Sequence, residues 1–177
     1  MTERAGDPAG AGTPSPDGSF TFEVLLEAPT DRVWQALVRG EQRSRWLRLP
    51  GHPGPQTAVD LEQGATETLQ ARATIGDHVE DLRRDTYVVD VAPGRRLVLV
   101  YRAVVNARPR WVSLITVHLD APPSHDHDLT RMTWTEQYTF LTPPSADDVA
   151  HLRGGTRLLL TALAVALGVA PRPAAER

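Results

Sequence analysis

The chain has 177 residues, a formal net charge of -3 and a hydrophobic fraction of 41%, values typical of an ordinary globular protein with one domain. A slightly acidic balance argues against a nucleic-acid partner, because proteins that bind the phosphate backbone are normally basic. The sequence has no cysteine, which excludes disulfides, thiolate metal sites and cysteine nucleophiles.

The two ends of the chain are poor in large apolar side chains. Residues 1–18 are mostly glycine, proline, alanine and aspartate, which predicts a disordered tail, and residues 170–177 are expected to form a second one. The folded domain is therefore expected over residues 19–169. No apolar signal segment is visible, and the longest apolar stretch, 158–170, is too short for a membrane span. We expect a cytoplasmic protein.

The first predicted elements are a strand and two short helices. Apolar residues alternate from Phe20 to Leu26, the period of a strand with one buried face. Pro29 ends this strand, and Thr30 is a candidate N-cap for a short amphipathic helix. A second short helix is expected over residues 41–47. The proline- and glycine-rich segment 50–55 should be a loop.

The middle of the chain returns to a period of two and predicts six more strands. They are expected at residues 59–61, 69–75, 87–91, 97–101, 111–119 and 129–140. The polar segment 76–84 is interpreted as a loop or the end of a hairpin. Because no helix separates these strands, they should form one antiparallel sheet of seven strands with the first.

The last predicted element is a helix whose start is uncertain. Ser145 and Asp148 resemble a capping box, which would begin a helix from about Ala146 to Leu167, long enough to span the sheet. The Gly154-Gly155 pair is unusual there, since a glycine inside a helix costs on the order of 1 kcal/mol relative to alanine. Either the helix begins after the pair, or the glycines allow another group to approach it closely.

Three motifs carry a family resemblance. Ala28-Pro29 is followed by a VW-A-L helix at residues 33–37 and by Trp46, residues 93–97 match a P-G-x-R-L turn, and HLRGGTRLLLTAL at 151–163 takes the place of a final helix. With the order of elements, these motifs resemble the SRPBCC (START-like, Bet v 1-like) superfamily. They are most similar to the branch named for the activator of the heat-shock chaperone ATPase. Thr156 stands where many relatives carry tryptophan.

The resemblance covers nearly all of residues 20–168 and implies a specific α+β architecture. This is the helix-grip fold, in which a curved seven-stranded antiparallel sheet is closed by a long C-terminal helix, with two short helices after the first strand. The superfamily includes lipid carriers, hormone receptors and polyketide cyclases, so the resemblance implies a cavity between sheet and helix. It does not by itself name a function.

Glu136 is the most informative residue of the expected cavity. Alternation places it on the apolar face of the last strand, which should face the helix. A carboxylate there is costly unless it is hydrogen-bonded or opens onto a wet cavity. It is either a group that orients a ligand or exchanges protons, or a structural carboxylate at the rim or paired with an arginine such as Arg157 or Arg102.

Other candidate lining residues come from neighbouring strands and from the helix. The complete predicted ligand-binding set is Leu99, Tyr101, Trp111, Ser113, Ile115, Met132, Trp134, Glu136, Tyr138, Gly155 and Leu159. For each of the apolar members, plain core packing is the simpler interpretation. His151, near the start of the helix, is a second candidate acid–base residue beside Glu136, although a lone histidine there is more often structural or solvated.

Polar clusters at residues 77–81 and 125–128 contain metal-ligand side chains but lie in predicted turns without fixed geometry, so we expect no metal. The sequence has no Ser-His-Asp arrangement, phosphate-binding glycine loop or dinucleotide fingerprint, and we expect no cofactor.

Three functions remain open. The favoured one is binding of a small apolar or aromatic molecule in a cavity between the sheet and the C-terminal helix. The second is a polyketide cyclase- or aromatase-like enzyme that uses Glu136 and His151. The third, a co-chaperone-like interaction module, rests only on the name of the branch. The protein is expected to act as a monomer or a homodimer.

Overall fold

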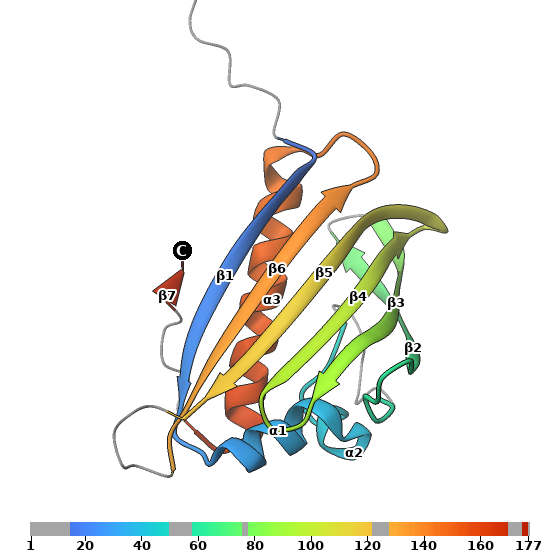
Figure 1. Ribbon diagram of the computed structural model, residues 1–177. Coiled ribbons are helices and arrows are strands. Elements are labelled where there is room, and N and C mark those ends of the chain that lie inside the picture. Colours follow the sequence, from blue (N-terminus) through green and yellow to red (C-terminus); the bar gives the residue numbers. More distant parts are fainter. Residues whose placement is uncertain (1–14, 50–57, 76–77, 122–127, 170–174, 177) are drawn as a thin grey trace, which may run out of the picture.

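A curved antiparallel sheet with one long helix across its concave face organises the chain (Figure 1). The computed structural model describes residues 15–49, 58–75, 78–121, 128–169 and 175–176. The strands are β1 (Asp17–Leu26), β2 (Thr66–Ile75), β3 (His78–Ala92), β4 (Arg96–Val105), β5 (Arg108–Asp120), β6 (Thr130–Phe140) and the two-residue β7 (Ala175–Glu176). The helices are α1 (Thr30–Val38), α2 (Gly40–Arg43) and α3 (Ala146–Ala166).

The order of strands in the sheet is β2-β3-β4-β5-β6-β1-β7. Each strand from β2 to β6 pairs with the next one along the chain, as short hairpin connections require, and β1 closes the far side by pairing with β6. The register shifts at Val88/Asp90 and at Ala103/Val104, and such bulges bend and twist the strands. The α+β prediction with an antiparallel sheet and a C-terminal helix is confirmed.

The prediction of seven strands is wrong for the segment 59–61. These residues form no strand and are held against the helices instead. The Leu61 amide donates to the Val38 carbonyl (2.8 Å), and the Asp60 carboxylate accepts from the Gly40 amide (2.6 Å). Six long strands form the sheet. The two residues of β7, which add to β1, come from the segment predicted as a C-terminal tail.

The segment 76–84, interpreted as a loop or the end of a hairpin, is not a loop from His78 onward, where β3 has begun and pairs with β2 at the end of a hairpin. Charged residues lie on both faces of this stretch, Glu80 and Arg84 on one and Asp81, which pairs with Arg72 (2.7 Å), on the other, so no apolar alternation marks the strand. Residues 76–77 lie outside the described part of the chain. So do residues 122–127 and most of both predicted tails, and the domain boundaries 19 and 169 stay predictions.

The start of α3 is decided by its cap. The Ser145 hydroxyl accepts a hydrogen bond from the Asp148 amide (3.2 Å), and the Asp148 carboxylate accepts one from the Ser145 amide (2.8 Å). These bonds satisfy two amides that a helix end otherwise leaves free. The helix runs through Gly154-Gly155. Because a Cβ built on either glycine has no described atom within 4 Å, the pair serves no close packing contact.

The cap should make the stability of the protein depend on pH. Partial burial opposes ionisation of Asp148, but hydrogen bonds from Ser145 and the nearby Arg110 together hold the pKa of its carboxyl below the ordinary value. Its stabilising contribution is therefore present above about pH 4 and lost as the pH falls through the lowered pKa. Urea unfolding should show the wild type about 1 kcal/mol more stable than Asp148→Asn at pH 6. The difference should shrink at pH 3, and a constant difference would contradict this account.

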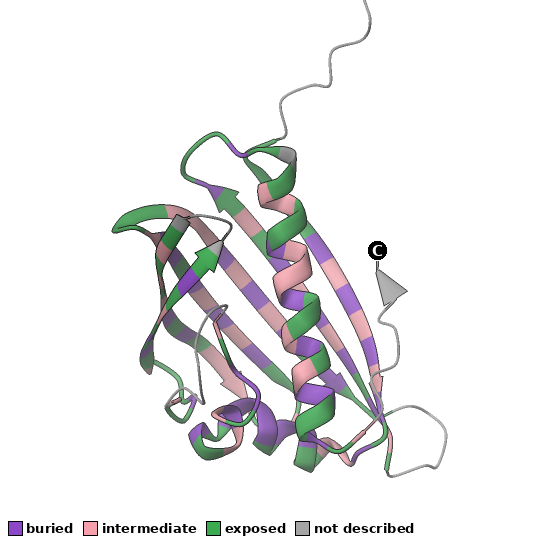
Figure 2. Cartoon of the chain, turned by 180° about the vertical axis from the view of Figure 1, so that it is seen from behind, coloured by how far each residue is buried: buried purple, intermediate pink, exposed green. Residues whose placement is uncertain are grey.

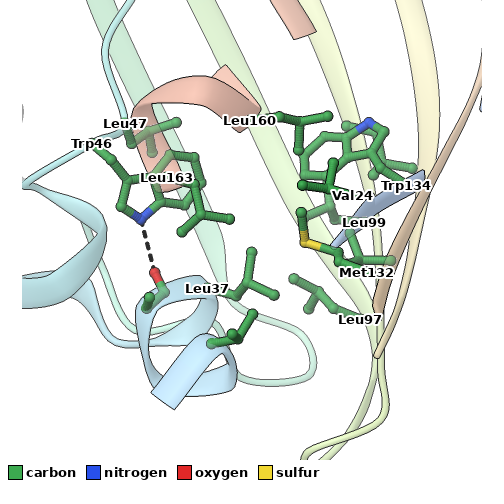
Figure 3. Packing of buried hydrophobic residues seen from close by; sticks show 14 of the residues in the cluster. Val24, Leu37, Trp46, Leu47, Leu97, Leu99, Met132, Trp134, Leu160 and Leu163 are labelled. Atoms are coloured by element: carbon green, nitrogen blue, oxygen red, sulfur yellow. Dashed lines mark hydrogen bonds between the residues drawn. The ribbon is translucent and has the colours of Figure 1, made fainter. Parts of the chain in front are cut away.

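The apolar core fills the space between the sheet and the C-terminal half of α3. Leu160 and Leu163 of α3 face Trp134 and Met132 of β6, and Leu37 of α1 closes the end (Figure 3). Beside α1, the indole of Trp46 donates to the Ala36 carbonyl (2.9 Å) and ties the chain after α2 to that helix. This half of the space beneath α3 is filled by packed apolar side chains.

Candidate functional site

A hydrogen-bonded cluster centred on Glu136 lies under the N-terminal half of α3. Glu136 is 1% exposed, and its Oε1 accepts from the Tyr101 hydroxyl at 2.6 Å. Its Oε2 accepts from the Thr156 hydroxyl at 3.0 Å and from the Trp134 indole at 3.4 Å. Donors from β4, β6 and α3 thus surround the carboxylate, which accounts for its tolerance of burial.

Tyr101 links this carboxylate to a second tryptophan. Its hydroxyl accepts from the Trp111 indole at 3.0 Å while it donates to Glu136. Burial, and next the charge of Glu136, raise the pKa of Tyr101 far above its ordinary value, although the Arg84 guanidinium and the nearby Ser113 hydroxyl act in the opposite direction. The phenol therefore stays protonated and acts as a hydrogen-bond donor, not as a base.

Three buried polar atoms beside Tyr101 have no hydrogen-bond partner of acceptable geometry. They are Arg84 Nε, Thr86 Oγ1 and Ser113 Oγ, and only one other buried side-chain atom of the described residues shares this property. Thr86 pairs with Tyr101 across β3 and β4, and Tyr101 pairs with Ser113 across β4 and β5. Thr86, Tyr101 and Ser113 therefore form one row on the same face of the sheet.

Such a grouping is unusual in a folded protein. An unpaired buried polar group costs about 1–3 kcal/mol, and native structures hold few of them. Ser113 is 0% and Thr86 5% exposed, so bulk water does not solvate them. The row is therefore equipped to bind polar atoms that the chain itself does not supply.

The two flanks of α3 face different parts of the sheet. Arg153 and Arg157 place their guanidinium carbons 5.9 and 5.5 Å from the centroids of phenylalanine rings of β1. On the other flank, Asp148 lies 3.3 Å from Arg110 of β5. In Figure 2, α3 crosses the concave face with β1 on one side and β3 and β4 on the other.

Gly155 and Leu159 share the flank of Asp148, because residues spaced by seven and four lie on one side of a helix. Both are half-buried, and open space adjoins Gly155. The glycine flank of α3 thus borders the half of the sheet that holds Tyr101 and its unpaired neighbours.

The structure brings together only part of the predicted ligand-binding set. Tyr101, Trp111, Trp134 and Glu136 form the hydrogen-bonded cluster, and Ser113 lies beside it. Leu99, Ile115 and Met132 are buried in the apolar core. Tyr138 is half-buried and packs between the rings of Phe20 and Phe140, at 6.1 and 5.6 Å.

Two other expectations about the site do not agree with the geometry. His151 is exposed on α3, and no bond of the described residues joins it to Glu136. Arg102, named as a possible partner of Glu136, instead pairs with Asp85 at 2.8 Å on the opposite face of the sheet. The other arginine named for that role, Arg157, lies over the Phe22 ring.

Sequence reasoning missed Thr156, Arg84 and Thr86. The sequence did contain a signal for Thr156, because this residue replaces a tryptophan of many relatives and falls four residues before Leu160 on the apolar side of the helix. Arg84 and Thr86 had one as well, because the alternation of β3 extends back from Val88. The polar composition of residues 76–84, which favours a loop or the end of a hairpin, conceals that alternation.

Two hollows lined by described residues lie outside this cluster. One, of about 520 Å³, is on the opposite face of the sheet over Val112, Leu114 and Gln137. The other, of about 160 Å³, lies between α1 and residues 60–62. Neither opens beneath α3, so the case for a site there comes from its unpaired polar atoms and not from a volume.

The arrangement of a helix closing a curved sheet agrees with a known family. The model of the family described as Activator of Hsp90 ATPase homolog 1-like protein matches residues 27–168. The chain belongs to this family. As a member of the Activator of Hsp90 ATPase homolog 1-like family it also falls in the SRPBCC superfamily, which confirms the resemblance seen in the sequence. None of the described helices has the length and apolar character of a membrane span.

Solved structures of similar proteins support the same assignment. The Mll3558 protein from Rhizobium loti is 33% identical over 85% of this chain and 96% of its own, with a TM-score of 0.69. A protein from Rhizobium leguminosarum is 27% identical over 86% and 95%, with a TM-score of 0.71. DynU16, from the dynemicin biosynthetic locus, is 22% identical over 88% and 48%, with a TM-score of 0.54, and shares the fold. No curated protein has a significant match to this chain.

Proposed function

We propose that this member of the Activator of Hsp90 ATPase homolog 1-like family binds a small apolar or aromatic molecule on the concave face of the sheet, beside the N-terminal half of α3. The observation that carries the proposal is the row of unpaired buried polar atoms around Tyr101. Binding sites are mostly apolar, with a few polar groups that orient the ligand. Trp111 would supply a flat apolar surface next to these groups.

The geometry supports binding more than catalysis. A general acid or base must reach the reacting atom, whereas Glu136 is 1% exposed and already accepts three hydrogen bonds. The raised pKa of Tyr101 likewise suits a fixed donor. The cyclase-like alternative therefore stays a prediction, because Glu136 is inaccessible and the exposed His151 has no bond to it among the described residues. The co-chaperone-like alternative still rests on a name alone.

Titration with the neutral fluorescent probe N-phenyl-1-naphthylamine tests the proposal. At one hundred times its dissociation constant, the probe should stabilise the protein by about 2.7 kcal/mol. For a chain of this length that is a rise in melting temperature on the order of 5–10 °C. If neither this probe nor a panel of neutral aromatic compounds shifts the melting temperature, the proposal fails.

A matched pair of variants locates the site. Trp111→Ala should weaken probe binding, because it removes the flat surface beside Tyr101. Tyr87→Ala, which also removes an aromatic side chain but from the opposite face of β3, where Tyr87 is 49% exposed, should leave binding unchanged. Equal effects of the two variants would place the probe elsewhere.

A further inference from the structure

Arg84 is an arginine that points into the fold without a carboxylate partner. The neighbouring outward arginines are paired: Arg83 with Asp85 at 3.2 Å, and Arg72 with Asp81 at 2.7 Å. Among the described residues, no ion pair involves Arg84, and its Nε is buried with no hydrogen-bond partner. In the part of the chain that the structure describes, the Arg84 guanidinium therefore has no counter-charge.

The ring of Tyr101 separates this charge from Glu136. The Arg84 guanidinium carbon lies 4.0 Å from the centroid of the ring, a cation–π contact. The hydroxyl at the far end of the same ring donates to Glu136. The Glu136 oxygens are directed to Tyr101, Thr156 and Trp134, so no direct contact with Arg84 neutralises the guanidinium.

The unpaired groups around Arg84 can all donate hydrogen bonds. A guanidinium can only donate, whereas the unpaired Thr86 and Ser113 hydroxyls can donate as well as accept. The Tyr101 proton is already used on Glu136. An oxygen-rich group from a ligand would complete this set, and a planar fork such as that of Arg84 matches a carboxylate best.

We propose that the ligand of this site is an aromatic or apolar monocarboxylic acid. Arg84 would bind its carboxylate with help from the Thr86 and Ser113 hydroxyls, and its apolar body would lie against Trp111 and the Gly155 flank of α3. The proposal rests on the proposed function and specifies its ligand class. Because Arg84 is half-buried, the carboxylate of a ligand that enters from solvent would be able to reach its guanidinium.

The test compares 2-naphthoate with 2-naphthamide, two probes of the same shape that differ in charge, by calorimetric titration of the full chain at pH 7. The wild type should bind the acid at least about tenfold more tightly, the effect expected of one hydrogen-bonded charge. Arg84→Met keeps an apolar stem over Tyr101 and should remove this preference, so that the acid and the amide bind with dissociation constants within about threefold of each other.

Arg83→Met is the matched control, because Arg83 is the adjacent residue, faces outward and pairs with Asp85. It should retain the preference for the acid. Equal binding of the two probes to the wild type, which needs no variant, would overturn the acid assignment and leave the proposed function standing. Binding of neither probe would overturn both. A preference that survives in a folded Arg84→Met would also overturn the assignment.

Discussion

Replacing Arg43 with methionine should lower the free energy of unfolding by about 3–5 kcal/mol. Arg43 of α2 and Glu67 of β2 are 4% and 6% exposed, and they form a bidentate pair with distances of 2.7 and 2.8 Å. The variant leaves the Glu67 carboxylate buried without its counter-charge, and desolvation of a lone charge is among the largest penalties that one substitution can cause.

The same pair organises the segment that replaces the strand expected at 59–61. The Arg43 guanidinium donates to the Val59 carbonyl at 2.6 Å, and the Val59 amide donates to the Glu67 carboxylate at 3.0 Å. Loss of the arginine should therefore also release this segment from α2 and β2. Faster hydrogen exchange of the Val59 and Leu61 amides would report that release.

Urea unfolding of three variants checks the expectation. The double variant Arg43→Met/Glu67→Leu should recover much of the loss, because removal of both charges leaves neither one buried alone. Arg72→Met is the control: it breaks an ion pair whose partners are 72% and 62% exposed and should change stability by less than about 0.5 kcal/mol. If Arg43→Met proved as mild as this control, the buried pair would not stabilise the fold.

Substitution of Gly155 by leucine should weaken binding of N-phenyl-1-naphthylamine by at least about tenfold while the fold becomes more stable. A Cβ at this position has no described atom within 4 Å, so a larger side chain fits there and would occupy the flank of α3 proposed to contact the ligand. A tenfold loss of affinity corresponds to about 1.4 kcal/mol, and the loss of a ligand's apolar contacts readily exceeds this value. Leucine is also the better helix former, by up to about 1 kcal/mol.

Gly154→Leu provides the matched control. Gly154 has equally open surroundings, but it is rotated by about 100° around the helix axis from Gly155. It therefore lies on the side of α3 that carries the exposed Leu158. It should give a similar gain in stability with unchanged probe affinity. The decisive measurements are a fluorescence titration and a urea unfolding curve for each variant. Equal affinities for Gly155→Leu and the wild type would remove the α3 flank from the proposed site.

Much of the architecture could be predicted from local sequence signals, because those signals act over a few residues. Alternating apolar residues from Phe20 to Leu26 and over residues 129–140 predict strands with one buried face, and the structure has both strands. The Ser145 cap likewise predicts the start of a helix. The same alternation directs Glu136 inward, and the structure has it 1% exposed.

The local signal was insufficient where long-range contacts decided the conformation. Three residues at 59–61 show a period of two by chance, but hydrogen bonds to Val38 and Gly40 hold that segment against the helices. In β3, the inward row itself contains Glu80, Arg84 and Thr86, so no apolar alternation marks the strand, and its pairing with β2 and β4 decides its conformation.

What the sequence by itself determined is therefore the fold family and the inward position of Glu136, since both follow from short-range periodicity and motifs. Only the tertiary structure decided which groups satisfy that carboxylate and which polar atoms stay unpaired. Tyr101 and Thr156 lie 35 and 20 residues from Glu136 along the chain, and the sheet register and the path of α3 bring them together. Hydrogen-bond satisfaction depends on distance and direction in space, so the polar row around Arg84 becomes visible only in the folded chain.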